Sequence, residues 1–129
     1  MKIFSIVILC FLFLIIGYLL GTWKPLSTFM TGSNSIKGTT EVKVTVLGPT
    51  NQPVTNLEVD IATKNGPPTA EGVRTTDAQG VATFNLKAGH YFVFFNTTKF
   101  PSDFNVPRES EIDVIEGQIN AKTIILSTK

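Results

Sequence analysis

The chain has 129 residues, and its 11 lysine and arginine side chains nearly balance its 10 aspartates and glutamates. All ten acidic residues lie after residue 40, whereas Lys2, Lys24 and Lys37 precede it, so the later part of the chain is slightly negative. A nucleic-acid-binding surface, which depends on clustered positive charge, is therefore not expected. A domain of about 90 residues buries a modest core, which favours a binding or spacer role over an enzyme with a deep pocket.

The first 24 residues predict a transmembrane signal-anchor helix. No charged side chain occurs in residues 3–23, and a helix of that length spans about 31 Å, which matches the hydrocarbon core of a bilayer. A cleaved signal peptide is the alternative, but its apolar region is usually shorter, and Leu19 is large for the small-x-small pattern that would precede cleavage at Gly21. Cys10, the only cysteine, lies inside this segment, so no disulfide can form within the chain.

The charges around this segment bear on how the chain is oriented. Lys2 and the free amine precede it and Lys24 follows it, so the positive-inside bias is weak. A short N-terminus is usually retained while the following domain is translocated. We therefore expect a single-pass protein of the cell membrane, with its N-terminus in the cytoplasm and its C-terminal domain extracytoplasmic. Residues 25–38 are rich in Ser, Thr, Gly and Asn and predict a flexible stalk.

From residue 39 onward the apolar residues recur at every second position, which is the side-chain repeat of a half-buried strand. The first two alternating runs are separated by turn formers and are expected to make a hairpin-like pair. The expected strands are residues 42–46, 57–61, 73–76, 82–86, 91–95, 111–115 and 122–126, with no helix among them. Residues 39–129 therefore predict an all-β domain, a seven-stranded antiparallel Greek-key sandwich of Ig-like or transthyretin-like type.

A turn with a defined chemistry lies at the centre of this domain. Asp77 can accept a hydrogen bond from its own downstream backbone, and Gly80 can adopt the positive φ that closes such a turn, so the two residues are expected to shape a hairpin. Large apolar residues after it are expected in the core, and a second glycine lets the chain reverse before a tyrosine packs. The residues of this fold motif are Asp77, Gly80, Phe84, Leu86, Gly89 and Tyr91.

The order Thr76-Asp77-Ala78-Gln79-Gly80, Phe84, Leu86 and Ala88-Gly89-His90-Tyr91 resembles the carboxypeptidase regulatory-like family, also described as transthyretin-like or prealbumin-like. The run Gln52-Pro53-Val54 is similar to the turn after that family's first strand, with Gln52 where glycine is usual. The likeness covers nearly all of residues 40–126. It implies a β-sandwich that serves as an accessory, spacer or binding module, and it implies no reaction.

Two specialised relatives of that fold fit the residues less well. Domains of the collagen-adhesin B type often contain a Lys–Asn isopeptide bond, but Lys43 is expected to point outward and the expected last strand has no Asn, since Asn120 lies just before it. Transthyretin-like hydrolases end in Tyr-Arg-Gly-Ser, whereas this chain ends in Leu126-Ser127-Thr128-Lys129. Neither chemistry is therefore expected.

The remaining polar residues do not predict an enzyme. The lone histidine, His90, follows Gly89 and is interpreted as a turn residue, because one imidazole without partners cannot make a common zinc site. Glu109, Glu111 and Asp113 alternate along one strand face. That row is interpreted as a solvated, aggregation-resistant face, with calcium binding as the alternative. We expect no catalytic residue, no metal and no cofactor.

The stretch Tyr91-Phe92-Val93-Phe94-Phe95 is too aromatic for one core face. If alternate residues point inward, Phe92 and Phe94 point outward and form a candidate interface with Phe100 and Phe104 of the following loop. The alternative is that residues 96–107 fold back and cover them. Asn96-Thr97-Thr98 is also an N-glycosylation sequon, which matters only in a host that glycosylates secreted chains.

These features together predict a non-enzymatic, membrane-anchored extracytoplasmic interaction module. Such a module would be a small subunit of a larger membrane or surface assembly, with a protein partner bound through exposed aromatic residues. The alternative is a domain at the cell surface that binds carbohydrate or another small ligand through Tyr91 or the loop aromatics. No nucleic-acid partner is expected.

Overall fold

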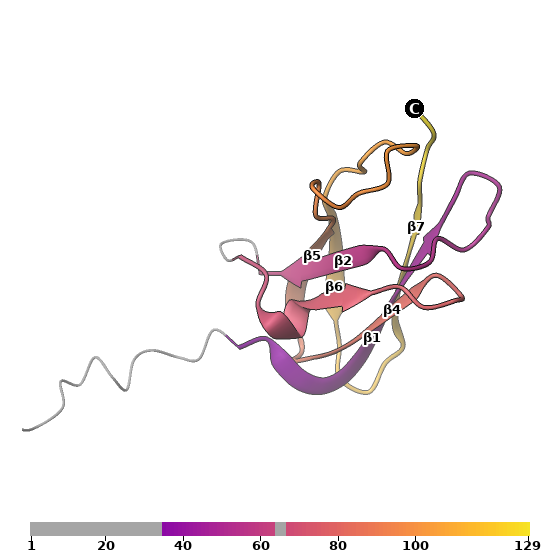
Figure 1. The fold of residues 1–129 in the computed structure, drawn as a ribbon. Helices are drawn as coiled ribbons and strands as arrows, with labels where there is room; N and C mark the ends of the chain where they lie inside the picture. The colour runs from indigo at the N-terminus through magenta and orange to yellow at the C-terminus, as the bar shows by residue number, and fades with distance from the viewer. Residues whose placement is uncertain (1–34, 64–66) are drawn as a thin grey trace, which may run out of the picture. The chain divides into compact units, whose positions relative to one another are not determined.

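The computed structural model describes residues 35–63 and 67–129 (Figure 1). The predicted transmembrane helix, Cys10 and nearly all of the predicted stalk lie outside these residues. Within the described ranges, no helix has both the length and the apolar character needed to span a bilayer. Residues Ser35–Lys129 form one compact unit, so the domain begins slightly before the change of apolar period at residue 39.

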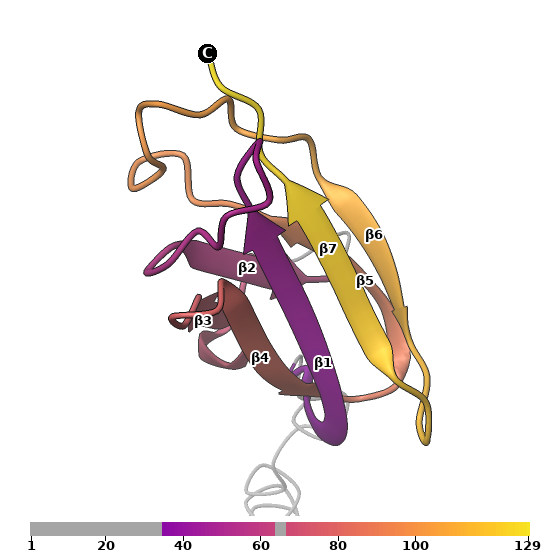
Figure 2. The ribbon, with the colours of Figure 1, turned by 90° about the vertical axis from the view of Figure 1, so that its right-hand side faces the viewer.

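Seven strands and one short 3-10 turn make up this unit, and they pack as two sheets (Figures 1 and 2). The three-stranded sheet has the order β4-β1-β7, and the four-stranded sheet has the order β3-β2-β5-β6. The strand count and the two-sheet sandwich confirm the prediction. The elements are β1 (Lys37–Leu47), β2 (Glu58–Ala62), η1 (Ala70–Gly72), β3 (Val73–Thr75), β4 (Val81–Leu86), β5 (Gly89–Phe94), β6 (Ser110–Val114) and β7 (Asn120–Ile125).

The pairing of the strands corrects two expectations. The sandwich is not wholly antiparallel, because β1 and β7 pair in parallel from Val42 opposite Asn120 to Leu47 opposite Ile125. The first two strands do not form a hairpin either, since β1 and β2 belong to different sheets. Turn residues show where a strand ends, but they do not show whether the next strand stays in the same sheet or crosses to the other one.

The core lies between the two sheets and is filled by the inward residues of each alternating run, as predicted. Val42, Val44 and Val46 of β1 are fully buried, and they face the buried residues of β2 and β5 across the sandwich. Phe84 is the largest of the fully buried side chains, and the Arg74 guanidinium lies 5.9 Å from the centre of its ring. Packing of this kind supplies the stability of a domain that contains no cysteine.

The central turn has the predicted chemistry but a different place in the fold. The Asp77 Oδ1 atom accepts hydrogen bonds of 2.9 Å from the backbone N–H groups of Gln79 and Val81. Gly80 has a φ of +74°, and an added Cβ would lie 2.6 Å from the Val46 carbonyl oxygen, so glycine is required there. The turn joins β3 to β4, which lie in different sheets, so it is a crossover and not a hairpin.

Candidate interaction surfaces

The predicted aromatic interface is not an open patch. Phe92 is only 6% exposed, which contradicts the expectation that it stands in solvent, and Phe94 is half-buried. Phe100 and Phe104 are partly buried and pack against the core, with the Phe100 ring edge-on to Phe95 at 5.4 Å between centroids. The alternative, in which the loop folds back, therefore describes Phe100 and Phe104 better.

The C-terminal segment holds this loop in place. The Asn105 N–H donates to the Ser127 carbonyl at 2.9 Å, and the Asn105 amide donates to the Thr128 carbonyl at 2.8 Å. Phe104 and Thr128 also form an isolated β-bridge. These contacts join residues more than 20 positions apart, so no local sequence pattern predicted them.

Of two residues in the predicted fold motif, Tyr91 has its expected place and Gly89 lacks its expected backbone conformation. Tyr91 is buried, its hydroxyl donates a 2.9 Å hydrogen bond to the Lys87 carbonyl, and burial raises the pKa of this phenol. It is therefore a core residue, as the fold motif predicts, and it cannot stack on a ligand in solvent. Gly89 begins β5 and is not among the described glycines with positive φ, which are Gly80 and Gly117. The reversal before Tyr91 thus needs no left-handed glycine.

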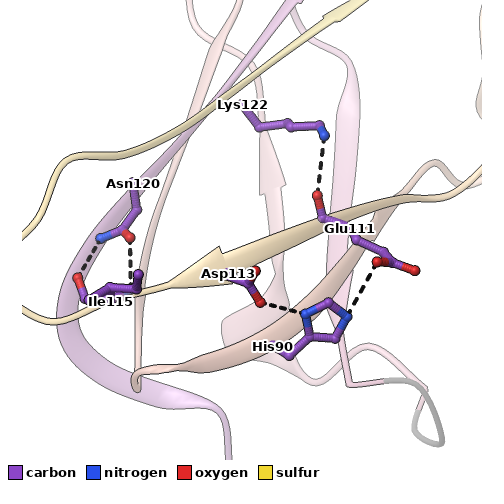
Figure 3. Close-up of polar contacts among 6 residues, drawn as sticks. All are labelled: His90, Glu111, Asp113, Ile115, Asn120 and Lys122. Atoms are coloured by element: carbon purple, nitrogen blue, oxygen red, sulfur yellow. Dashed lines mark hydrogen bonds and ion pairs between the residues drawn. The ribbon is translucent and has the colours of Figure 1, made fainter.

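His90 is a strand residue of β5, which corrects its interpretation as a turn residue. Antiparallel pairing places it opposite Asp113, and Phe92 opposite Glu111. The imidazole lies between the two carboxylates, with Nδ1 2.6 Å from Asp113 Oδ1 and Nε2 3.8 Å from Glu111 Oε2 (Figure 3). Sequence reasoning missed this cluster because it depends on the register between β5 and β6.

The acidic row on β6 is exposed, as its interpretation as a solvated face requires. Glu111 and Asp113 point outward and surround His90, and Glu109 lies before the strand. In residues 35–63 and 67–129, no group of three or more His, Cys, Asp or Glu side chains is arranged to hold a metal ion.

A second polar cluster lies on β2, in the same sheet. The Asn96 amide donates to Glu58 Oε1 at 2.9 Å, and the Lys99 ammonium donates to Glu58 Oε2 at 2.8 Å. The bond from Lys99, followed by that from Asn96, lowers the pKa of the Glu58 carboxyl. Asn96, the acceptor residue of the sequon, is thus already engaged through its side-chain amide.

Asp60 lies two residues further along β2 in a very different environment. It is 5% exposed, and its Oδ1 atom has no hydrogen-bond partner. Burial, and then the charge of Glu58, raise the pKa of the Asp60 carboxyl. Because the folded chain keeps this proton to a higher pH than the unfolded chain does, ionisation of Asp60 costs stability as the pH rises above about 4, where an unfolded aspartate titrates.

Asp60→Asn is therefore expected to raise the free energy of unfolding near neutral pH, by about 1 kcal/mol. The gain should shrink as the pH falls and disappear below about 4, where the wild-type carboxyl is protonated in both states. Urea unfolding measured at several pH values tests this expectation. Glu58→Gln is the matched control with the opposite sign, since it should lower stability near neutral pH and converge with the wild type in acid. A lower free energy of unfolding for Asp60→Asn than for the wild type at neutral pH would contradict the expectation.

Asn120, the first residue of β7, organises the turn between β6 and β7. Its Oδ1 atom accepts the Ile115 N–H at 2.8 Å, and its amide nitrogen donates to the Ile115 carbonyl at 3.1 Å (Figure 3). The same nitrogen donates to the Gln118 carbonyl at 3.1 Å. Beside it, the Lys122 ammonium donates to the Glu111 carbonyl at 3.2 Å. Yet Ile115 and Ile119 in this turn are 47% and 96% exposed.

The positions of Asn120 and Lys43 show whether an isopeptide bond can form between them. The last strand does begin with an asparagine, which corrects the expectation, but Asn120 points inward and is committed to the turn. Lys43 points to the opposite face of the sheet, where its ammonium is exposed and lies 3.1 Å from Glu41. The amine and the amide are therefore not placed to react with each other.

No protein-family model matches the chain, and no curated protein matches it. The resemblance to the carboxypeptidase regulatory-like family therefore stays a prediction.

Solved structures of similar fold do exist. GBS52, the minor pilin of Streptococcus agalactiae, is 17% identical with a TM-score of 0.60, over 73% of this chain and 46% of its own. BcpA, the major pilin subunit of Bacillus cereus, is 16% identical with a TM-score of 0.59, over 70% and 29%. The Bacillus anthracis TIE protein is 19% identical with a TM-score of 0.58, over 70% and 17%. The chain thus spans less than half the length of each, and what it shares with them is the β-sandwich fold.

Proposed function

We propose that the protein is a non-enzymatic, membrane-anchored module whose β-sandwich takes part in protein–protein assembly outside the cytoplasm. The observation that carries the proposal is the fold, which is shared with the minor pilin GBS52 and the major pilin subunit BcpA. Pilin subunits are structural components of surface assemblies. The uncharged run of residues 3–23 supports the anchoring part of the proposal.

The arrangement of the domain suits a tethered module. The chain enters at the start of β1 and leaves beyond β7, and these points lie at opposite ends of the sandwich (Figure 2). The C-terminal end carries the loop of residues 96–107, which is bonded to the C-terminal segment. It also carries two exposed apolar side chains, Val106 at 44% and Ile125 at 59%. If the N-terminal segment is the anchor, the C-terminal end is the end opposite the anchored one, and it is therefore the more accessible to a partner.

No observation favours the alternative of carbohydrate binding. Tyr91 is buried and bonded to the backbone, and the loop phenylalanines pack against the core. Two grooves of the described surface hold about 440 and 330 Å³. Both are lined mainly by polar residues at the start of β1, the first together with the turn before β7 and the second together with the turn between β4 and β5. Sugar recognition usually uses an exposed aromatic ring in such a groove, and neither groove contains one.

Fractionation of cells that produce the full chain tests the proposal. We expect the chain to stay with the membrane through alkaline extraction, and external protease to digest the domain in intact cells or spheroplasts. After mild detergent extraction, photo-crosslinking groups at Val106 and Ile125 should yield adducts with another protein, and a group at the exposed Thr83 should serve as the control. Complete release into the soluble fraction, or an absence of adducts at all three positions, would contradict the proposal.

A further inference from the structure

The turn formed by residues 115–119 exposes more apolar surface than its fold requires. Ile119 is 96% exposed, so it contributes almost no packing to the domain. The turn itself depends on Gly117, whose φ is +76°, and on the hydrogen bonds of Asn120. A polar residue at position 119 would be compatible with the same turn. The exposed isoleucine therefore indicates a contact with something outside the domain.

This turn is held firmly. Asn120 is 7% exposed, and its amide bonds to both backbone groups of Ile115 and to the Gln118 carbonyl. The Gln118 N–H also donates to the Ile115 carbonyl at 3.3 Å. Ile115 and Ile119 are therefore presented on a preorganised turn, which reduces the entropy lost when they contact another surface.

The turn lies at the end of the sandwich where the chain enters. Ile36 is buried, and its carbonyl accepts the Lys87 N–H at 3.0 Å, which fixes the point of entry beside β4. The Lys87 ammonium donates to the Ser35 carbonyl at 2.9 Å. One groove is lined by both Thr39–Thr40 and residues 116–120, so the start of β1 and the turn are neighbours, as Figure 2 also shows.

We propose that Ile115 and Ile119 insert into the interfacial layer of the bilayer in which the N-terminal segment is anchored. This inference rests on the proposed function, because it requires residues 3–23 to lie in the membrane. Between that segment and Ser35 there remain roughly ten residues, which reach at most about 35 Å. Such a tether keeps the turn at an effective concentration in the millimolar range near the lipid surface, so two isoleucines suffice for contact.

The surroundings of the turn fit a lipid surface better than a second copy of the chain. A specific dimer usually buries about 800 Å² on each partner, which far exceeds one turn with two isoleucines. Lys37 and Lys87 are exposed at this end and can meet lipid phosphates, although Glu41 and Glu116 are also present and keep the end near neutral. The contact therefore depends mainly on the apolar side chains.

The test uses the full chain reconstituted in vesicles of phosphatidylcholine and phosphatidylglycerol. Cys10→Ser removes the native thiol, and Gln118→Cys then carries an environment-sensitive fluorophore while both isoleucines stay intact. We expect lipids with a shallow acyl-chain spin label to quench this fluorophore about twofold or more, because interfacial groups lie near that depth. Ile115→Ser with Ile119→Ser should abolish the quenching, and Ile125→Ser, also an exposed isoleucine, should leave it intact. A fluorophore at Thr97→Cys, in the loop at the opposite end, should show none.

The outcomes separate the two proposals. A chain that floats with the vesicles but shows no quenching at position 118 overturns the inserted turn and leaves the anchor standing. A chain that fails to float overturns the anchor and the inserted turn together. Energy transfer between copies labelled at position 118, persisting in detergent and lost in the double serine variant, would assign the turn to a second copy and overturn contact with lipid.

Discussion

Phe84→Ala is expected to lower the free energy of unfolding by about 3–5 kcal/mol. Phe84 is fully buried between the two sheets, and alanine would leave a cavity where its ring stands. The Arg74 guanidinium over the ring would also lose its aromatic partner. Since a domain of this size is usually stable by only 5–15 kcal/mol, roughly, the variant should be partly unfolded under mild denaturant.

Pulse proteolysis of the detergent-solubilised chain across a urea series measures this loss. Thr83→Ala is the matched control, because Thr83 is the preceding residue of β4 and its side chain is exposed on the other face of the sheet. We expect Thr83→Ala to change stability by no more than about 0.5 kcal/mol. Equal urea midpoints for the two variants would show that the space between the sheets is not the core.

Asn120→Ala is expected to cost about 2–3 kcal/mol, the next largest effect. The substitution leaves the Ile115 N–H without its acceptor, and the carbonyls of Ile115 and Gln118 without their donor. Asn120→Asp keeps the acceptor but turns a carboxylate toward carbonyl oxygens, so it should be at least as harmful near neutral pH. It should recover part of the loss in acid, where a protonated carboxyl can donate one hydrogen bond.

The same urea series measures these variants, with Gln118→Ala as the control. Gln118 is exposed in the same turn and bonds to Asn120 and Ile115 through its backbone groups. Gln118→Ala should therefore lower the free energy of unfolding only slightly. A second readout is the exchange rate of the Ile115 amide proton, which should rise in Asn120→Ala and stay unchanged in Gln118→Ala. Unchanged exchange in both variants would mean that Asn120 does not hold the turn.

The burial of the strands followed from their sequences. Val42, Val44 and Val46 alternate with polar residues, and an extended chain places alternate side chains on one face, so their common burial needs no knowledge of the partner strand. The Asp77–Gly80 turn was predictable for a similar reason, since its hydrogen bonds join residues at most four positions apart. Both features depend on local geometry.

The candidate surfaces were much less predictable. Alternation correctly put Phe92 on the outer face of its strand, but outer did not mean exposed, because Phe92 is 6% exposed in the folded domain. His90 seemed isolated along the chain, yet the register of β5 with β6 sets it between Asp113 and Glu111. The role of Asn120 likewise depends on the closure of the turn over it.

The sequence by itself determined that residues after 39 form strands, which of their side chains turn toward the core and where the central turn lies, because these properties repeat over two to four residues. Only the tertiary structure decided that β1 pairs in parallel with β7, that the central turn crosses between sheets, and that Ile115 and Ile119 stand beside the point of chain entry. These outcomes depend on contacts between residues far apart in the chain. They are selected by the closure of the two sheets over one core, which no local pattern encodes.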